Sequence, residues 1–302
     1  MSGGPRRTEA RNPKARGLAS FTTRQILELM NDEDATVAAA VRAALPQVER
    51  AVDAIVTALG SGHRLRYIGA GTSGRLGVLD ASEAPPTFGV DEELVVGIIA
   101  GGDPALRQSI EGAEDDSGAG ARAARDHVRE GDVLVGISAS GRAKYVTAAM
   151  VMAREVGART VALTCDASSP LATDADITIA VDVGPEVLAG SSRLKAGTAT
   201  KLVLNTLTTG AMLRLGKAYG NMMVDLMDLS VKLHDRGERI VMECCGVSRE
   251  EARAAIDRAE GSVKLAIVML RNRVDAATAR KQLEQSGGFV RPVVGDPPAV
   301  TR

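Results

Sequence analysis

The sequence has no tryptophan, and aromatic residues amount to only 2% of its 302 residues. Single-stranded nucleic acids usually stack their bases on exposed aromatic rings, so this scarcity argues against that mode of binding. The chain also lacks an excess of either charge, because 37 basic and 38 acidic residues are mixed along it. Such a balance gives no overall attraction to nucleic acid or to an anionic membrane. We therefore predict neither partner.

Cysteines are scarce, and long apolar runs are missing. The three cysteines, Cys165, Cys244 and Cys245, are too few and too scattered for a disulfide framework or a zinc site. We expect the adjacent pair to be small buried residues of a helix. No apolar stretch reaches the ~20 residues needed to span a bilayer, and residues 1–17 lack the apolar core of a signal peptide. The sequence thus predicts a cytoplasmic protein with a mobile N-terminal tail and no metal site.

Five short apolar runs alternate with helix-length stretches in the middle of the chain. Each run is rich in β-branched residues and apolar on both faces, which is typical of parallel strands covered by helices on both sides. The predicted fold is therefore α/β, a doubly wound parallel sheet, with an N-terminal helix and a small all-helical C-terminal subdomain. The runs span residues 64–70, 93–102, 132–141, 159–165 and 175–184.

Helical patterns fill both ends of the chain. Thr22 or Thr23 caps a predicted helix that continues to Leu59, and residues 198–233 show helical apolar spacing with few breakers. A weak repeat of 27 residues aligns 247–264 with 274–291. The predicted organisation is a flexible tail at 1–20, a helical segment at 21–52, a phosphosugar-binding domain at 53–216 and a helical region with the repeat at 217–302.

The stretch YIGAGTSGRLG contains a G-x-G-x-x-G pattern, Gly69, Gly71 and Gly74, between a predicted strand and a predicted helix. This pattern is typical of dinucleotide-binding turns. Such sites also require an acidic residue near the end of the second strand. Here that strand closes on Gly101 and Gly102, and we read the following Asp103 as a helix cap. The dinucleotide hypothesis is therefore disfavoured.

Hydroxyl-rich turns follow two of the predicted strands. The first carries Gly71, Thr72 and Ser73, and the second carries Ser138, Ser140 and Gly141. Because ligands bind outside the carboxyl ends of strands in open α/β sheets, both turns could reach one anion. Hydroxyls and helix N-terminal N–H groups would hold a sugar phosphate without metal. The alternative is that these residues only cap helices.

Two hydroxyl-rich loops on parallel strands resemble the sugar isomerase domain, which binds sugar phosphates. Longer segments are similar to the N-acetylmuramic acid 6-phosphate etherases, from about Thr8 to Arg291. The resemblance implies cleavage of the D-lactyl ether of N-acetylmuramic acid 6-phosphate to N-acetylglucosamine 6-phosphate and D-lactate. It also implies a homodimer with the site near the subunit interface, and no metal or organic cofactor. The segments are TEARNP, MNDEDATVAAAV, YIGAGTSGRLGVLDASEAPPTFGV, EGAEDD, GPEVLAGSSRLKAGTATKLVLN and LGKAYGNMMVDL.

The family's two functional carboxylates correspond to Glu83, in DASEAPPT, and Glu114, in GAEDD. An ether at C3 can leave by elimination once the opened sugar's aldehyde acidifies the C2 proton, which requires a base and an acid. We predict that Glu83 protonates the departing lactate and later activates water, and that Glu114 is the base at C2. Alone, either could be a surface glutamate. The chain departs from the family at Ala143–Lys144, where Thr-Pro is common, and at Ala84, where Cys is frequent.

Further polar groups follow the last predicted strand. Glu186 could contact sugar hydroxyls or a partner subunit. Ser191 and Lys195, with the neighbouring Ser192 and Arg193, could reach phosphate or the lactate carboxylate. The alternative is that these residues only cap a helix or carry charge on the surface. His63 and His127 are expected to be exposed connector residues. His234 is expected to be structural, because no serine–acid constellation accompanies it.

Two other functions fit the same fold. A phosphosugar aldose–ketose isomerase shares the base at C2 but needs no acid for a leaving group. A non-catalytic sugar-phosphate-responsive regulator would keep the fold without turnover. The presence of both glutamates favours the lyase. The apolar residues over 212–229 are a second argument for a homodimer.

Overall fold

The computed structural model describes residues 7–226 and 231–299, which form two compact units. The first comprises residues 7–82 and 93–208, and the second comprises residues 83–92, 209–226 and 231–299. Within the described residues, no helix combines the length and apolar character needed to cross a membrane. Most of the candidate site residues lie in the first unit.

The N-terminal part of the first unit is a chain of short turns and helices. Thr22 caps α1 in a capping box with Gln25, as one of the two predicted caps. The single helix predicted up to Leu59 is wrong, because it is divided into three. Pro46 lies in the first turn of the third helix, where a backbone N–H would have no partner within the helix. In the interior of one continuous helix the same proline would remove a hydrogen bond and clash with the preceding turn, so the helix is interrupted there. The elements are η1 (Arg7–Glu9), η2 (Pro13–Ala15), η3 (Leu18–Ser20), α1 (Thr23–Asp34), α2 (Val37–Ala43) and α3 (Leu45–Gly60).

The five predicted strands form one parallel sheet, which confirms the predicted fold class. Its order is β2-β1-β3-β4-β5. Strand β1 pairs in register with β2 and β3, with Leu65 opposite Val95 on one side and Val133 on the other. The strands are β1 (Leu65–Gly69), β2 (Val95–Ile99), β3 (Val133–Ile137), β4 (Arg159–Thr164) and β5 (Ile177–Ala180).

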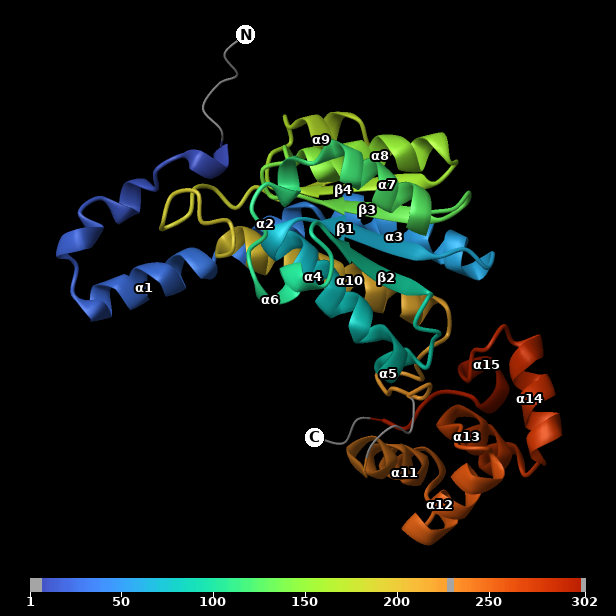
Figure 1. The fold of residues 1–302 in the computed structure, drawn as a ribbon. Coiled ribbons are helices and arrows are strands. Elements are labelled where there is room, and N and C mark those ends of the chain that lie inside the picture. The colour runs from blue at the N-terminus through green and yellow to red at the C-terminus, as the bar shows by residue number, and fades with distance from the viewer. Residues whose placement is uncertain (1–6, 227–230, 300–302) are drawn as a thin grey trace. The chain divides into compact units, whose positions relative to one another are not determined.

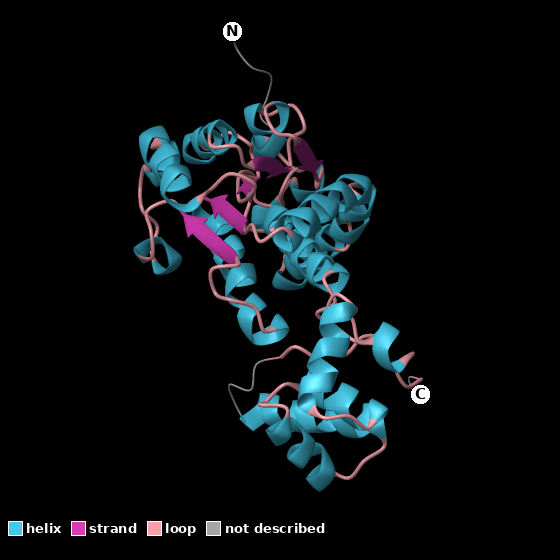
Figure 2. Cartoon of the chain, turned by 90° about the vertical axis from the view of Figure 1, so that its right-hand side faces the viewer, coloured by secondary structure: helices cyan, strands magenta, loops and turns pink. Residues whose placement is uncertain are grey.

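Helices cover both faces of this sheet (Figures 1 and 2). On one face, Tyr67 of β1 packs against α4 and forms a hydrogen bond with Thr208 of α10. On the other face, Ile68 and Leu134 pack against Tyr145 and Val146 of α8. The helices of this region are α4 (Gly71–Ser82), α6 (Pro104–Arg107), α7 (Ser117–His127), α8 (Lys144–Glu155), α9 (Pro170–Thr173) and α10 (Lys195–Arg214), with η4 (Ala113–Asp115) before α7.

Glycines bring α4 unusually close to the sheet. A Cβ on Gly97 of β2 would lie 2.5 Å from the Cα of Val78, and one on Gly74 would lie 2.7 Å from the carbonyl oxygen of Gly69. No side chain larger than hydrogen fits at either position. The motif glycines therefore serve the packing of helix against strand, and this closeness fixes where α4 begins.

The second unit contains α5 (Ala84–Phe88) and the helices α11 (Val231–Cys245), α12 (Arg249–Arg258), α13 (Val263–Asn272), α14 (Ala276–Gln285) and α15 (Arg291–Val294). Both copies of the 27-residue repeat have the same local structure: Ser248 caps α12, and Asp275, 27 residues later, caps α14. Cys244 is buried and Cys245 is half-buried on α11, as predicted for a helical pair.

The continuous helix predicted over residues 198–233 is wrong, because α10 ends at Arg214 and residues 215–226 are not helical. Gly216 and Gly220 have positive φ angles, which an α-helix does not accommodate, and Tyr219 pairs with Met222 in a short bridge. Tyr219, Val224 and Leu226 are buried in the core of the second unit. Met222 and Met223 pack against the same core, and Met227 and Leu229 lie outside the described residues.

Candidate active site

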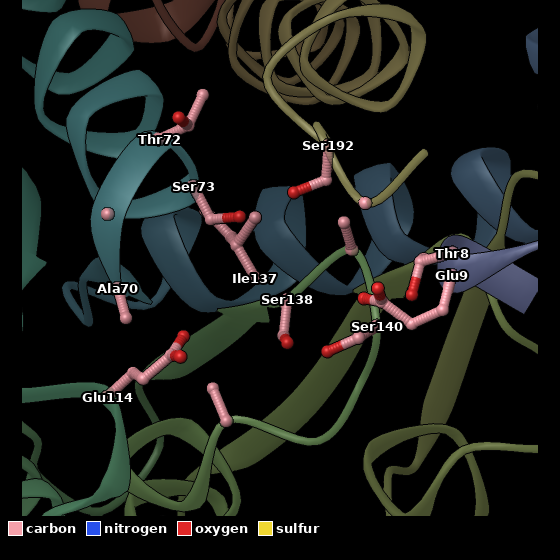
Figure 3. A pocket seen from close by; sticks show the side chains of 14 residues that line it. Thr8, Glu9, Ala70, Thr72, Ser73, Glu114, Ile137, Ser138, Ser140 and Ser192 are labelled. Atoms are coloured by element: carbon pink, nitrogen blue, oxygen red, sulfur yellow. The ribbon is translucent and has the colours of Figure 1, made fainter. Parts of the chain in front are cut away.

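The sheet topology marks one place where a cleft must open. The chain leaves β1 through α4 toward β2, and it leaves β3 through α8 toward β4, on the opposite side. Neighbouring strands whose connections diverge in this way leave a crevice beyond their carboxyl ends. A cavity of about 320 Å³ lies there, lined by the turns after β1 and β3 (Figure 3).

The turn after β1 presents hydrogen-bond donors to this cavity. Gly71 adopts a positive φ of 54°, which turns the chain directly from the strand into α4. The first N–H groups of a helix have no partner within it, and they carry the positive end of its dipole. Thr72 and Ser73 line the cavity, and their hydroxyls form no hydrogen bond with any described residue. This turn is suited to bind an anion.

The turn after β3 completes the donor set. Ser138 is buried, and its hydroxyl has no partner in the described part of the chain, whereas the Ser140 Oγ accepts a hydrogen bond from the Arg142 N–H. Both line the cavity. Gly141 does not: it lies behind the turn with a φ of 64°, and a Cβ there would overlap Ser169. Gly141 therefore shapes the turn.

Carboxylates line two sides of the cavity. Figure 3 shows Glu114 on one side and Thr8 with Glu9 on the other, with Ser138 between them. None of the described lining residues is Lys, Arg or His, so hydroxyls and N–H groups are the donors here. Thr8 and Glu9 were not predicted as site residues. The only signal was their place in the segment TEARNP, which the resemblance covers but to which it gives no role.

The departure at Ala143–Lys144 lies at this cavity too. Ala143 lines it, and the Lys144 ammonium forms an ion pair of 3.4 Å with Asp115. The residue next to Glu114 is thus tied to the turn after β3. In the described residues, no cluster of His, Cys, Asp and Glu could hold a metal ion.

The other predicted catalytic residue, Glu83, lies in the second unit. It is the exposed residue directly before α5, whose first turn contains Pro85 and Pro86. It is not among the residues that line the cavity. The structure therefore places one of the two glutamates at the cavity of the first unit, and the role of the other stays a prediction.

Glu186 and Lys195, both predicted to contact ligand, have protein partners. The Glu186 carboxylate is buried and accepts hydrogen bonds of 3.0 Å from the N–H groups of Lys195 and Ala196, so it caps α10. The buried Lys195 ammonium forms an ion pair of 2.5 Å with Glu33. Ser191 is half-exposed and is not among the cavity-lining residues, whereas its neighbour Ser192 is.

Glu33 joins three segments of the chain. It is 5% exposed, and besides Lys195 it accepts hydrogen bonds of 2.8 Å from Asn12 and from Lys14. Burial by itself raises the pKa of this carboxyl, but the hydrogen bonds from Lys14, Lys195 and Asn12 outweigh it and lower the pKa to about 2. Glu33 therefore anchors the segment that carries Thr8 and Glu9.

Family comparisons agree with this architecture. Residues 116–210 match the family described as SIS domain, and residues 47–154 match the one described as glucokinase regulatory protein N-terminal SIS domain. A solved phosphoheptose isomerase from Francisella tularensis covers 64% of this chain and 100% of its own, with 18% identity and a TM-score of 0.49. The two SIS family matches together span residues 47–210, the stretch that contains the five-stranded sheet.

Curated relatives define the class more narrowly. An N-acetylmuramic acid 6-phosphate etherase from Aeromonas hydrophila is 52% identical over 284 residues, covering 94% of this chain and 95% of that protein. One from Salmonella paratyphi A is 50% identical over 285 residues, covering 94% and 96%. The chain belongs to the N-acetylmuramic acid 6-phosphate etherase family, which confirms the resemblance drawn from the sequence.

Proposed function

We propose that this protein is a carbon–oxygen lyase that cleaves the D-lactyl ether of N-acetylmuramic acid 6-phosphate. The products are N-acetylglucosamine 6-phosphate and D-lactate. The observation that carries this proposal is the identity of about half of all residues with etherases over nearly the whole chain. The cavity supports it, because it combines donors for a phosphate with a carboxylate at its wall.

The chemistry requires a base and an acid rather than a nucleophile. Alkoxide is a poor leaving group, so direct displacement at C3 is slow. When the sugar opens, the C1 aldehyde acidifies the C2 proton, and the C3–O bond can break as that proton is removed. The electron pair of the C2–H bond forms the C2–C3 double bond, and the pair of the C3–O bond goes to lactate, which takes a proton. Water then adds at C3 and a proton returns to C2.

Glu114 is the proposed base at C2, because it lines the cavity in which the hydroxyl-rich turns would hold the phosphate. Glu83 is the proposed acid, which protonates the departing lactate and then activates water. Its assignment rests on the family motif and on its exposed position before α5. Two carboxyls in different surroundings suit opposite proton-transfer roles.

The test is release of D-lactate from N-acetylmuramic acid 6-phosphate by the purified protein. Glu114→Gln and Glu83→Gln should each lower kcat about 100-fold or more, since a positioned acid or base contributes roughly 10²–10⁴-fold. Glu92→Gln, at an exposed glutamate of the Glu83 segment, should retain the wild-type rate. Interconversion of aldose and ketose phosphates without lactate release would instead favour the isomerase hypothesis.

We also propose that the protein is a cytoplasmic homodimer with the site near the subunit interface. Tyr219, Val224 and Leu226, part of the stretch that suggested an interface, are buried within the second unit. The dimer proposal therefore rests on the family resemblance and on exposed apolar side chains such as Leu27 and Leu188, each 59% exposed.

A further inference from the structure

A second cavity, of about 240 Å³, adjoins the one that the hydroxyl-rich turns line. The two share Ala70, Gly71 and Glu114 as lining residues. The second cavity is otherwise lined by α4, by α6 and by the segment between α6 and η4. A ligand that extends past Glu114 from the first cavity therefore enters the second.

Among the described residues that line this second cavity, Arg75 is the only cationic one. It lies in the first turns of α4, partly buried, and its Nε and Nη2 donate hydrogen bonds to the carbonyl oxygens of Leu106 and Gln108. No carboxylate of the described residues forms an ion pair with it, although Glu111 and Glu114 line the same cavity. A guanidinium has five N–H donors, so three remain for a ligand.

We propose that Arg75 binds the carboxylate of the lactyl group, so that the second cavity is the leaving-group subsite. This inference rests on the proposed function, which gives the substrate two anionic groups: a phosphate at C6 and a carboxylate on the ether at C3. Within the described part of the chain, the first cavity offers hydroxyls and N–H groups but no cation, whereas the second offers one planar cation. Guanidinium matches a carboxylate in two parallel hydrogen bonds better than it matches a neutral ether.

The position of Arg75 has a consequence for the elimination. As the C3–O bond breaks, negative charge develops on an oxygen only one carbon away from the lactyl carboxylate. Arg75 neutralises that carboxylate, which lowers the repulsion between the two groups while the acid delivers its proton. Arg75 acts here only as a cation and hydrogen-bond donor, and Glu83 remains the proposed acid. Arg75 is therefore a substrate-binding residue that selects ethers with an acidic side chain.

The experiment compares two ethers of N-acetylglucosamine 6-phosphate: the natural D-lactyl ether and the 3-O-ethyl ether, which lacks the carboxylate. Formation of N-acetylglucosamine 6-phosphate is measured for both. Arg75→Gln should lower kcat/KM for the lactyl ether roughly 30-fold, the range of a charge-assisted double hydrogen bond, and change kcat/KM for the ethyl ether less than about threefold. Arg107→Gln, at an exposed arginine of α6 that does not line this cavity, is the matched control and should leave both values unchanged.

The structural role of Arg75 gives the competing outcome. If Arg75→Gln slows both ethers by the same factor, the guanidinium only holds the segment at Leu106 and Gln108, and the subsite assignment is wrong. Equal thermal shifts of wild type and variant with inorganic phosphate would show that the first cavity is intact. A wild-type protein that cleaves neither ether would refute the proposed function and the subsite together, an outcome distinct from equal slowing.

Discussion

The hydroxyls of Ser73 and Ser138 face the cavity without a partner in the described protein. We expect Ser73→Ala and Ser138→Ala each to raise KM roughly tenfold, because a hydrogen bond to a charged group contributes about 1.5–3 kcal/mol and 1.4 kcal/mol is a factor of ten. The value of kcat should change little, since the phosphate does not react. Steady-state kinetics of lactate release measure both constants.

Ser61→Ala is the matched control for these two variants. Ser61 is exposed and lies after α3, at the end of the sheet where β1 begins rather than ends. The KM of the Ser61→Ala variant should equal that of the wild type. A wild-type KM in both Ser73→Ala and Ser138→Ala would contradict phosphate binding by these turns.

At the scale of single residues, the sequence predicted the cavity in part. Thr72, Ser73, Ser138 and Ser140 were found because each follows a recognisable strand, and strand ends converge at one edge of a parallel sheet. The role of Lys195 as the ion-pair partner of Glu33 could not be predicted from its position after a strand. Its partner Glu33 is 162 residues away, and no local pattern announces that pairing.

Glu33 gives a prediction for stability against pH. Its pKa is about 2 in the folded protein, below the value of 4.5 for an unperturbed glutamate. The unfolded chain therefore binds a proton first, so the contribution of Glu33 is complete above pH 4.5 and is lost as the pH falls toward 2. Glu33→Gln should lower the free energy of unfolding at pH 7 by about 3 kcal/mol, since it leaves Lys195 buried without its carboxylate.

Thermal unfolding between pH 7 and pH 2 measures this contribution. The melting-temperature difference between wild type and Glu33→Gln should shrink below pH 4.5. Glu28→Gln, at an exposed glutamate of the same helix, should follow the wild type. A difference that is constant over the whole range would contradict a charged Glu33.

At the scale of elements, the approach of α4 to β2 depends on Gly97. A Cβ would lie 2.5 Å from the Val78 Cα, a backbone atom that cannot move aside without displacing the helix. Gly97→Ala should destabilise the protein by about 2 kcal/mol and lower its melting temperature. It should also raise KM, because α4 carries Thr72 and Ser73.

Gly197→Ala is the control for Gly97→Ala. Gly197 lies in α10, and a Cβ there would meet its nearest neighbours at an ordinary 3.7 Å. Because alanine favours helices over glycine by about 1 kcal/mol, this variant should be as stable as the wild type or more stable. Equal stability of Gly97→Ala and wild type in calorimetry would contradict the packing argument.

Helices and strands were predicted correctly where the pattern of apolar residues is unbroken along the element. All five strands were predicted because runs such as 132–141 are apolar on both faces, a pattern that helices on two sides impose. The end of α10 was missed because the apolar spacing continues past Gly216. Only the left-handed backbone at Gly216 and Gly220 shows that the chain turns there, and glycine in a sequence does not reveal its φ angle.

At the scale of the whole molecule, the dimer proposal predicts a mass. Light scattering at micromolar concentration should give about twice the 31.4 kDa of one chain. Dilution should shift the distribution toward single chains, because association follows mass action. Replacing exposed Leu188 with Asp should shift it further, and Leu79→Asp, at another exposed leucine, tests whether the effect is local. Single chains at every concentration would contradict the dimer.

The two adjoining cavities are built from different kinds of backbone. The hydroxyl-rich turns directly follow strands of the sheet, and glycine contacts fix the position of α4 there, whereas the wall from α6 to η4 lies outside the sheet and pairs with no described strand. Exchange of residues 104–112, which stops short of Glu114, would leave the turns after β1 and β3 unchanged and would alter the surroundings of the proposed lactyl subsite. One scaffold can thereby accept a different leaving group through changes confined to one connecting loop.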